Sequence, residues 1–304
     1  MNIFIAGHNG MVGRAIHDQL KRSDQDLNII TVEKSDLNLL DQNDVRNFFK
    51  KNQVDQIYLA AAKVGGIFAN QSYPADFIYE NLMIQSNIIN AANLADVERV
   101  LFLGSSCIYP KMTKQPIKEE YLLNGQLEPT NEWYSIAKIV GIKLIQAYRK
   151  QYNRDWISAM PTNLYGPGDN YNPETSHVLP ALIKKFHEAK LNNDDEVVVW
   201  GDGSPLREFM HCDDLADALV FLLQNYSKYD PINIGTGQEI SIKKLADIIA
   251  DIVGYKPRIK WDKTKPNGIH RKLLDSSRLY NLGWSNFRTL KEGILSTYSE
   301  WKNT

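Results

Sequence analysis

The chain has 304 residues, 43% of them hydrophobic, so it can bury a substantial core as one large domain or two modest ones. Its 35 basic and 36 acidic residues nearly cancel, which excludes an overall basic field that would attract nucleic acid or an acidic membrane. Its two cysteines, Cys107 and Cys212, lie far apart without metal-ligand spacing, so neither a disulfide framework nor a zinc site is expected.

The N-terminal segment predicts a buried strand, a glycine-rich loop and a helix. Residues 3–6 are apolar, and Gly7, Gly10 and Gly13 follow in a G-x-x-G-x-x-G pattern. Glycines let the backbone approach a pyrophosphate, and a helix N-terminus offers free N–H groups, so the pattern favours a dinucleotide site. A glycine-rich helix cap is the structural alternative. Because the segment has no charged leader and no apolar run has membrane-spanning length, we expect a cytoplasmic protein without a membrane partner.

A second strand is expected over residues 27–32, and the two residues at its end give opposite signals. In a dinucleotide-binding fold this position reaches the adenosine ribose. Glu33 would bind the 2′-hydroxyl of NAD, whereas Lys34 would neutralise the 2′-phosphate of NADP. The residues alone leave the choice between the two cofactors open.

Strands and helices then alternate at the period of a right-handed parallel sheet. A polar-faced helix over residues 41–51 precedes a third strand over 54–62, whose small residues would permit close cofactor contact. After a turn at 63–66, apolar residues at helical spacing between 77 and 89 predict a core or subunit face. A fourth strand is expected over 100–103.

The end of this fourth strand carries the most chemistry. Gly104 lets the backbone come close to a ligand, and Ser105, Ser106 and Cys107 follow directly, before Pro110 prevents the strand from continuing. Polar atoms at the carboxyl end of a core strand lie where open α/β sheets place their sites. A serine-rich turn is the structural alternative.

Tyr134 and Lys138 follow a looser section, residues 111–130. Four residues apart on a helix, their side chains share one face about one turn from each other. A lone Y-x-x-x-K pair often occurs by chance, but here a glycine loop and a serine-bearing strand end precede it.

The composition changes after residue 168. A strand at 156–160 is followed by a polar loop at 169–176, and an amphipathic helix is expected over 290–301. We expect residues 1–168 to form a dinucleotide-binding domain, to which core elements around 213–240 return, and residues 169–304 to form mainly a substrate-binding region. The predicted fold class is α/β, a Rossmann-type doubly wound parallel sheet with a smaller C-terminal substrate-binding region.

These motifs together resemble the extended short-chain dehydrogenase/reductases that act on nucleotide sugars. Residues 7–13, 60–66, 104–110, 161–167 and 271–275, with the Ser176-His177 pair, narrow the resemblance to the GDP-L-fucose synthase family. Its members convert GDP-4-keto-6-deoxy-D-mannose to GDP-L-fucose by 3,5-epimerisation and NADPH-dependent reduction of the 4-ketone. The resemblance covers nearly the whole chain and implies NADP(H) as cofactor, a GDP-sugar as substrate and a homodimer.

Within this resemblance the residue types suggest two sets of catalytic groups. Tyr134 would donate a proton to the ketone oxygen, Ser105 would hydrogen-bond that oxygen, and Lys138 would lower the phenol pKa and bind the nicotinamide ribose. Cys107 and His177 would be the base and acid of the epimerase reaction, whose enolate uses the same oxyanion site. A small buried hydrophobe and a packed helix-start residue are the structural alternatives for Cys107 and His177.

The resemblance also implies binding residues. Those for the cofactor are Gly7, His8, Asn9, Gly10, Met11, Val12, Gly13, Lys34, Leu103, Gly104, Ser105, Ser106, Lys138, Pro161, Thr162, Asn163, Leu164 and His177. Those for the GDP-sugar are Lys185, Trp200, Arg207 (expected on a turn), Asn267 and Lys272, because cations suit a diphosphate and tryptophan offers a flat apolar surface.

Three departures from the family pattern matter. Asn9 and Glu33 stand where relatives carry other residues, commonly basic ones, which leaves the strength of the NADPH preference over NADH open. Lys185 stands where arginine is frequent, so the charge is kept but the bidentate fork is lost.

Two other functions compete with this interpretation. A nucleotide-sugar 4-epimerase or 4,6-dehydratase would share the fold, but dehydratases usually carry an Asp-Glu pair where Ser106 and Cys107 stand here. A non-catalytic dinucleotide-sensing protein would be a different class, and such proteins tend to lose the tyrosine and lysine that this chain keeps as Tyr134 and Lys138.

Overall fold

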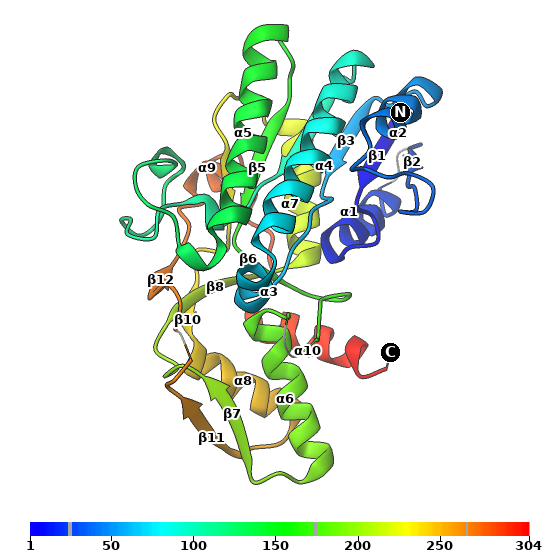
Figure 1. The fold of residues 1–304 in the computed structure, drawn as a ribbon. Helices are drawn as coiled ribbons and strands as arrows, with labels where there is room; N and C mark the ends of the chain where they lie inside the picture. The colour runs from blue at the N-terminus through cyan, green and yellow to red at the C-terminus, as the bar shows by residue number, and fades with distance from the viewer. Residues whose placement is uncertain (24–25, 173–174, 266, 304) are drawn as a thin grey trace.

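The larger lobe is built on a six-stranded parallel sheet (Figure 1). A computed structural model describes residues 1–23, 26–172, 175–265 and 267–303. The strand order is β2-β1-β3-β4-β5-β9, so the predicted Rossmann-type fold is confirmed. The strands are β1 (Asn2–Ala6), β2 (Asn28–Ile30), β3 (Gln56–Leu59), β4 (Arg99–Leu103), β5 (Ile157–Pro161) and β9 (Ile232–Ile234).

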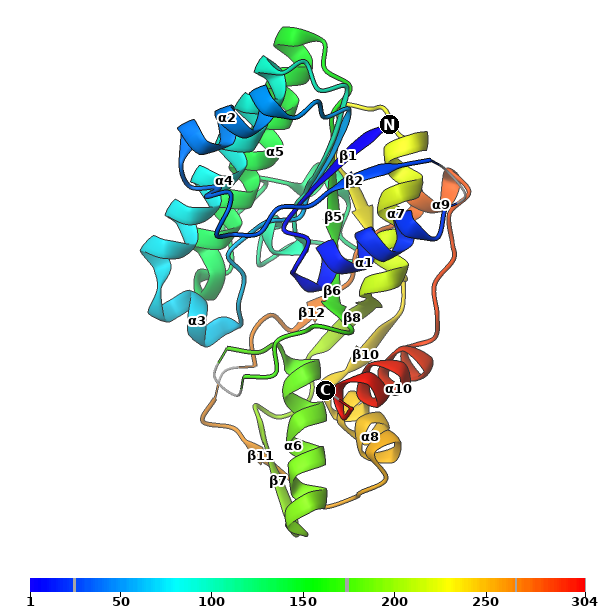
Figure 2. The same cartoon turned by 90° about the vertical axis from the view of Figure 1, so that its right-hand side faces the viewer.

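Helices cover both faces of this sheet, which is why its strands are apolar runs rather than alternating ones (Figure 2). One face packs against α2 (Gln42–Lys51), α4 (Pro74–Leu94) and α5 (Glu132–Tyr152), and the other against α1 (Met11–Lys21) and α7 (Cys212–Asn225). The predicted helix over 41–51 begins where expected, because the Asp41 side chain accepts the N–H groups of Asn43 and Asp44.

The smaller lobe lies beyond the carboxyl ends of these strands. In its four-stranded sheet, β8 (Leu206–His211) pairs with β6 (Asn163–Tyr165), β10 (Glu239–Ser241) and β12 (Arg271–Lys272). A second sheet joins β7 (Glu196–Trp200) to β11 (Arg258–Asp262). A separate apolar core lies between them and the helices α6 (Val178–Asn192), α8 (Ile242–Val253) and α10 (Leu290–Trp301).

Several elements differ from the sequence-based expectation. Arg207 lies in β8 and not on a turn, because it has register partners on both sides, Ile240 in β10 and Lys272 in β12. The third strand stops at Leu59, where its neighbour β1 stops in register at Ala6. The short strand β6 and the short helices α3 (Ile67–Ser72) and α9 (Ser277–Asn281) were not expected.

The C-terminal part of the chain returns to the larger lobe in two places. Besides α7 and β9, the segment around α9 packs there, and Leu279 and Trp284 share a buried cluster with Leu219. The predicted amphipathic helix over 290–301 is present as α10. Residues 173–174 of the predicted polar loop lie outside the described residues. Within the described part of the chain, none of the helices has the length and apolar character needed to cross a membrane.

Candidate active site

The glycine loop joins β1 to α1 and is shaped by close backbone packing. Gly7 has a φ of +90°, and a Cβ there would lie 2.7 Å from the Cα of Ala61. A Cβ on Gly13 would lie 2.1 Å from the carbonyl oxygen of Gly7. Gly10 precedes α1 and gives it no side-chain cap, so the N–H groups of the first turn can bind phosphate. The loop therefore fits a dinucleotide pyrophosphate.

The side chains of this loop contact the residue that follows β2. Asn9 Nδ2 donates to Glu33 Oε2 at 2.8 Å, and His8 Nε2 lies 3.3 Å from Glu33 Oε1. Lys34, the next residue, is exposed on the turn. The residues predicted to meet the adenosine ribose therefore lie beside the glycine loop.

The end of β4 is held by capping and by α5. Ser105 Oγ accepts the N–H of Cys107 at 3.2 Å, which begins a short 3-10 helix at Ser106–Ile108. Ser135 of α5 donates its hydroxyl to the Cys107 carbonyl at 2.9 Å. Ser135 was not among the predicted site residues, although it lies between Tyr134 and Lys138, which were. These bonds fix the backbone that carries Ser105 and Cys107.

Tyr134 and Lys138 lie on one face of α5, as their spacing predicts. The Tyr134 hydroxyl hydrogen-bonds with Ser105, and Lys138 Nζ lies 5.8 Å from the centre of the Tyr134 ring. Lys138 is only 3% exposed, and its ammonium donates to the Leu103 carbonyl at 2.7 Å. The strand end and α5 thus bring the three predicted reductase residues together.

Burial sets the ionisation of this pair. It raises the pKa of Tyr134, an effect that the neighbouring Cys107 adds to and the Ser105 hydrogen bond opposes. Burial also lowers the pKa of Lys138 to about 7. The net pKa of Tyr134 is therefore raised and not lowered as predicted, because desolvation dominates at both residues. Tyr134 consequently holds its proton at neutral pH.

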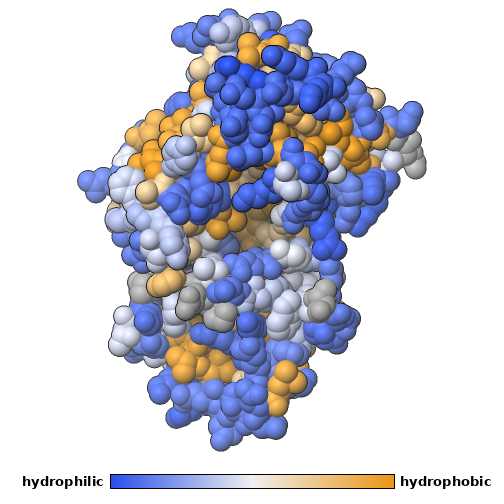
Figure 3. Space-filling view, turned by 45° about the vertical axis from the view of Figure 1, so that its right-hand side comes forward, coloured by the Kyte–Doolittle hydropathy of each residue, from blue (hydrophilic) through white to orange (hydrophobic). Residues whose placement is uncertain are grey.

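Cys107 contacts Lys272, a residue that was predicted to bind the GDP-sugar. Lys272 Nζ of β12 lies 3.5 Å from Cys107 Sγ, and Lys272 is only 7% exposed. His177 immediately precedes α6 and is open to solvent, yet surrounding protein atoms and then the charge of Lys272 lower the pKa of its imidazole. Lys272 is thus linked to both predicted epimerase groups, and its contact with Cys107 joins the two lobes. Figure 3 shows a hollow between these lobes.

The remaining residues predicted for GDP form two clusters in the smaller lobe. In the first, Lys185 Nζ donates to the Val198 carbonyl at 2.8 Å and lies 5.8 Å from the centre of the Trp200 ring. Lys265, which the sequence analysis missed, lies 5.3 Å from the same ring. A single lysine in a polar turn carries no sequence signal that it will lie beside Trp200.

The second cluster joins Arg207 to Asn267. Arg207 Nη1 donates to the Leu206 carbonyl at 2.8 Å, and Nη2 lies 3.4 Å from the Asn267 carbonyl oxygen. The Asn267 side chain accepts the N–H of Asp202 at 3.0 Å. Burial lowers the pKa of Arg207, and the neighbouring Cys107 opposes that effect. Arg207 is therefore close enough to Cys107 to interact with it electrostatically.

Glu208 is a structural residue of the site that the sequence analysis missed. It is fully buried, and its carboxylate accepts the N–H groups of Gly237 at 2.7 Å and Leu274 at 3.1 Å. Its carbonyl accepts the side chains of Thr162 and Asn163, both predicted to bind the cofactor. An acid inside a strand, between Arg207 and Phe209, was the available signal. Glu208 ties β8 to the chain that carries Lys272.

The other predicted cofactor residues lie at element ends around this cleft. They occupy the start of α1 (Met11 and Val12), the end of β4 (Leu103, Gly104 and the buried Ser106) and the β5–β6 junction (Pro161 and Leu164).

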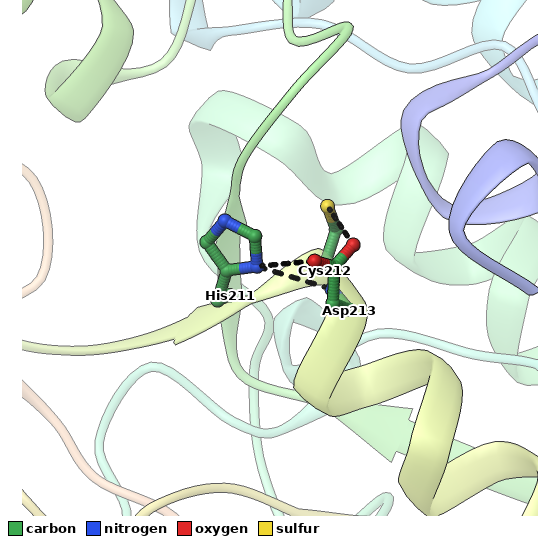
Figure 4. Close-up of side chains that lie close together, drawn as sticks. All are labelled: His211, Cys212 and Asp213. Carbon is green, nitrogen blue, oxygen red and sulfur yellow. Dashed lines mark hydrogen bonds and ion pairs between the residues drawn. The ribbon is translucent and has the colours of Figure 1, made fainter. Parts of the chain in front are cut away.

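Cys212 lies in a different cluster, with His211 and Asp213 at the start of α7 (Figure 4). Their donor atoms are close enough for a metal ion, but His211 Nδ1 already accepts the N–H of Asp213 at 3.2 Å. Arg288 Nη2 lies 3.4 Å from Asp213 Oδ2, and a cation there would be repelled. Burial raises the pKa of the Cys212 thiol, so we assign the cluster a structural role as a helix cap.

Comparison with known proteins agrees with this geometry. The profile of the NAD dependent epimerase/dehydratase family matches residues 3–235. A putative GDP-L-fucose synthase 2 of Arabidopsis thaliana is 58% identical, over 98% of this chain and 90% of its own length. The GDP-L-fucose synthase of Escherichia coli K12 is 54% identical, over 98% and 95% respectively. The chain belongs to the GDP-L-fucose synthase family.

A solved structure of this family supports the same conclusion. The GDP-L-fucose synthetase of Naegleria fowleri bound to NADP superposes with a TM-score of 0.92 at 27% identity, covering 99% of this chain and 92% of that one. The predicted family and the predicted cofactor, NADP(H), are therefore confirmed.

Proposed function

We propose that this chain is a bifunctional epimerase-reductase that converts GDP-4-keto-6-deoxy-D-mannose to GDP-L-fucose. The observation that carries the proposal is the meeting of two residue sets at the end of β4. Ser105 contacts Tyr134 on one side, and two residues further on Cys107 contacts Lys272. One substrate ring placed there would meet a proton donor for its ketone and a thiol for its neighbouring carbons.

In the reductase step, the protein manages the proton. NADPH, when bound, supplies the hydride. Tyr134 keeps its proton at neutral pH and donates it to the ketone oxygen, which Ser105 also hydrogen-bonds. The tyrosinate that remains stabilises the charged form of Lys138, whose pKa of about 7 lets it respond to that charge.

In the epimerase step, Cys107 and His177 exchange protons with the carbons beside the ketone. The Cys107 thiolate takes a proton from carbon, and the electron pair of that C–H bond moves to the ketone oxygen to form an enolate. His177 returns a proton from the opposite face. Lys272 Nζ lies 3.5 Å from Sγ, beside the atom that takes this proton. The enolate oxygen uses the same Tyr134 and Ser105 donors.

The smaller lobe would hold the GDP moiety. Arg207 and Lys185 would bind the diphosphate, and Trp200, which is 48% exposed at the end of β7, would offer its ring to base or sugar. We propose that residues 1–168, with α7 and β9, bind the cofactor and that residues 169–304 mainly bind the substrate.

We also propose a cytoplasmic homodimer that pairs through α4 and α5. Three large aromatic side chains on these helices are exposed, namely Tyr79, Trp133 and Tyr152. Aromatic residues are enriched at protein interfaces. Light scattering should give twice the chain mass, and Tyr79→Asp should shift that mass toward the monomer.

The decisive test mixes the purified protein with GDP-4-keto-6-deoxymannose and NADPH and follows NADPH absorbance and product stereochemistry. Loss of NADPH together with GDP-L-fucose as product is the expected result. A 4-epimerase would instead give product without net NADPH consumption, and a dinucleotide-sensing protein would give no turnover.

A further inference from the structure

We propose that this enzyme uses NADH as well as NADPH, because Glu33 offers the adenosine ribose a hydrogen-bond acceptor in addition to the charge of Lys34. Glu33 follows β2 beside the glycine loop, and two side chains of that loop hold its carboxylate. Asn9 Nδ2 donates to one oxygen at 2.8 Å, and His8 Nε2 lies 3.3 Å from the other. The carboxylate is thus oriented before any cofactor arrives, which reduces the ordering cost of binding.

The held carboxylate keeps capacity for another donor. Two carboxylate oxygens accept about four hydrogen bonds, and the two loop contacts use about half of that capacity. The Glu33 side chain is 60% exposed, so the remaining lone pairs are open to a ligand. The 2′-hydroxyl of an NAD-type adenosine ribose is a donor of the right kind for this position.

The 2′-phosphate of NADP is both repelled and attracted by charged residues at this position. Glu33 repels its negative charge, whereas the exposed Lys34, one residue further on, attracts it. Asn9 contributes a neutral amide and is already bonded to Glu33. In water each unit-charge interaction at about 4 Å changes binding by about fivefold, so the two residues nearly cancel. The ribose site therefore discriminates weakly between the two cofactors.

The test measures binding of the adenosine end alone. The full chain is titrated calorimetrically with ADP-ribose and with 2′-phospho-ADP-ribose, neither of which carries the nicotinamide. For the natural protein we expect dissociation constants within about tenfold of each other. Glu33→Gln should weaken ADP-ribose binding and tighten 2′-phospho-ADP-ribose binding, changing their ratio by about tenfold or more.

The matched control is Asp36→Asn. Asp36 is an exposed acid three residues further along the same turn, where its side chain accepts from Ser35, and its substitution also removes one negative charge. We expect it to change the ratio by less than about twofold. A preference of the natural protein above about a hundredfold for the phosphorylated fragment would overturn the proposal. So would an unchanged ratio in Glu33→Gln, or an equal shift in Asp36→Asn.

Kinetics give the second measurement. NADH should support sugar reduction with a kcat/KM within about tenfold of that for NADPH, and Glu33→Gln should move this ratio in the same direction as the fragments. Fragment binding needs no sugar substrate. A failure of the proposed sugar reaction would therefore leave the fragment result standing, and a fragment failure would leave the sugar reaction standing.

Discussion

The two sides of the cleft are built differently. Near the end of β4, Lys138 is almost fully buried, and the Ser105 and Tyr134 side chains are hydrogen-bonded to each other. In the smaller lobe, Trp200 is half exposed, and Lys185 and Arg207 donate to backbone carbonyls instead of carboxylates. Proton transfer depends on fixed distances and shifted pKa values, whereas a diphosphate can be met by cations that adjust to it. Substitutions on the first side should therefore lower kcat, and those on the second should raise KM.

The largest effect is expected from Tyr134→Phe. Removing the hydroxyl takes away the proton donor, so sugar reduction should fall by about 10² to 10⁴-fold. Exchange of the ring protons beside the ketone with deuterated water should partly survive, because Cys107 and His177 remain. Single-turnover NADPH oxidation and NMR measure the two steps separately, and unchanged reduction would rule out the proposed donor.

Cys107→Ser should separate the two steps in the other direction. Ring-proton exchange should fall by about a hundredfold or more, because a hydroxyl is a far weaker base than a thiolate. Cys212→Ser is the matched control, since Cys212 lies in the helix cap at α7 and should leave exchange intact. Full exchange in Cys107→Ser would remove this sulfur from the mechanism.

Arg207→Ala tests the recognition side of the comparison. We expect KM for the GDP-sugar to rise about tenfold or more, while kcat stays within about threefold. Arg207→Lys should recover part of the affinity, because it keeps the charge without the bidentate fork. Steady-state kinetics check this, and a loss of kcat as large as that of Tyr134→Phe would erase the distinction between the two sides.

The last prediction concerns stability and not the reaction. The pKa of Lys138 falls from 10.5 to about 7 on folding, so between these values the unfolded chain binds more protons than the folded one. Below about pH 7 the charged Lys138 lowers the free energy of unfolding by its full contribution. This loss is relieved as the pH rises toward 10.5. Its contribution to the slope is at most about 1.4 kcal/mol per pH unit. Urea unfolding of the cofactor-free protein across that window should show it, and Lys138→Met should flatten the curve.

Local patterns predicted much of the fold and of the reductase site. The alternation of strands and helices predicted β1 to β5. Sites of such folds form at the carboxyl ends of the strands, so the meeting of Ser105 with Tyr134 and Lys138 was expected. Contacts between distant segments were not predictable. Lys272 reaches Cys107 across 165 residues, which no spacing rule encodes. The raised pKa of Tyr134 was also hidden, because it depends on burial in three dimensions.

The register of β8 and β12 has a consequence for how the two lobes cooperate. Arg207 and Lys272 are partners on adjacent strands, and neither forms an ion pair with a carboxylate among the described residues. Two neighbouring positive charges therefore lie on paired strands, and the one on Lys272 lies beside the Cys107 sulfur. In the proposed reaction an anionic substrate would relieve their mutual repulsion, so one pair of strands would both anchor the phosphates and place a charge beside the thiol.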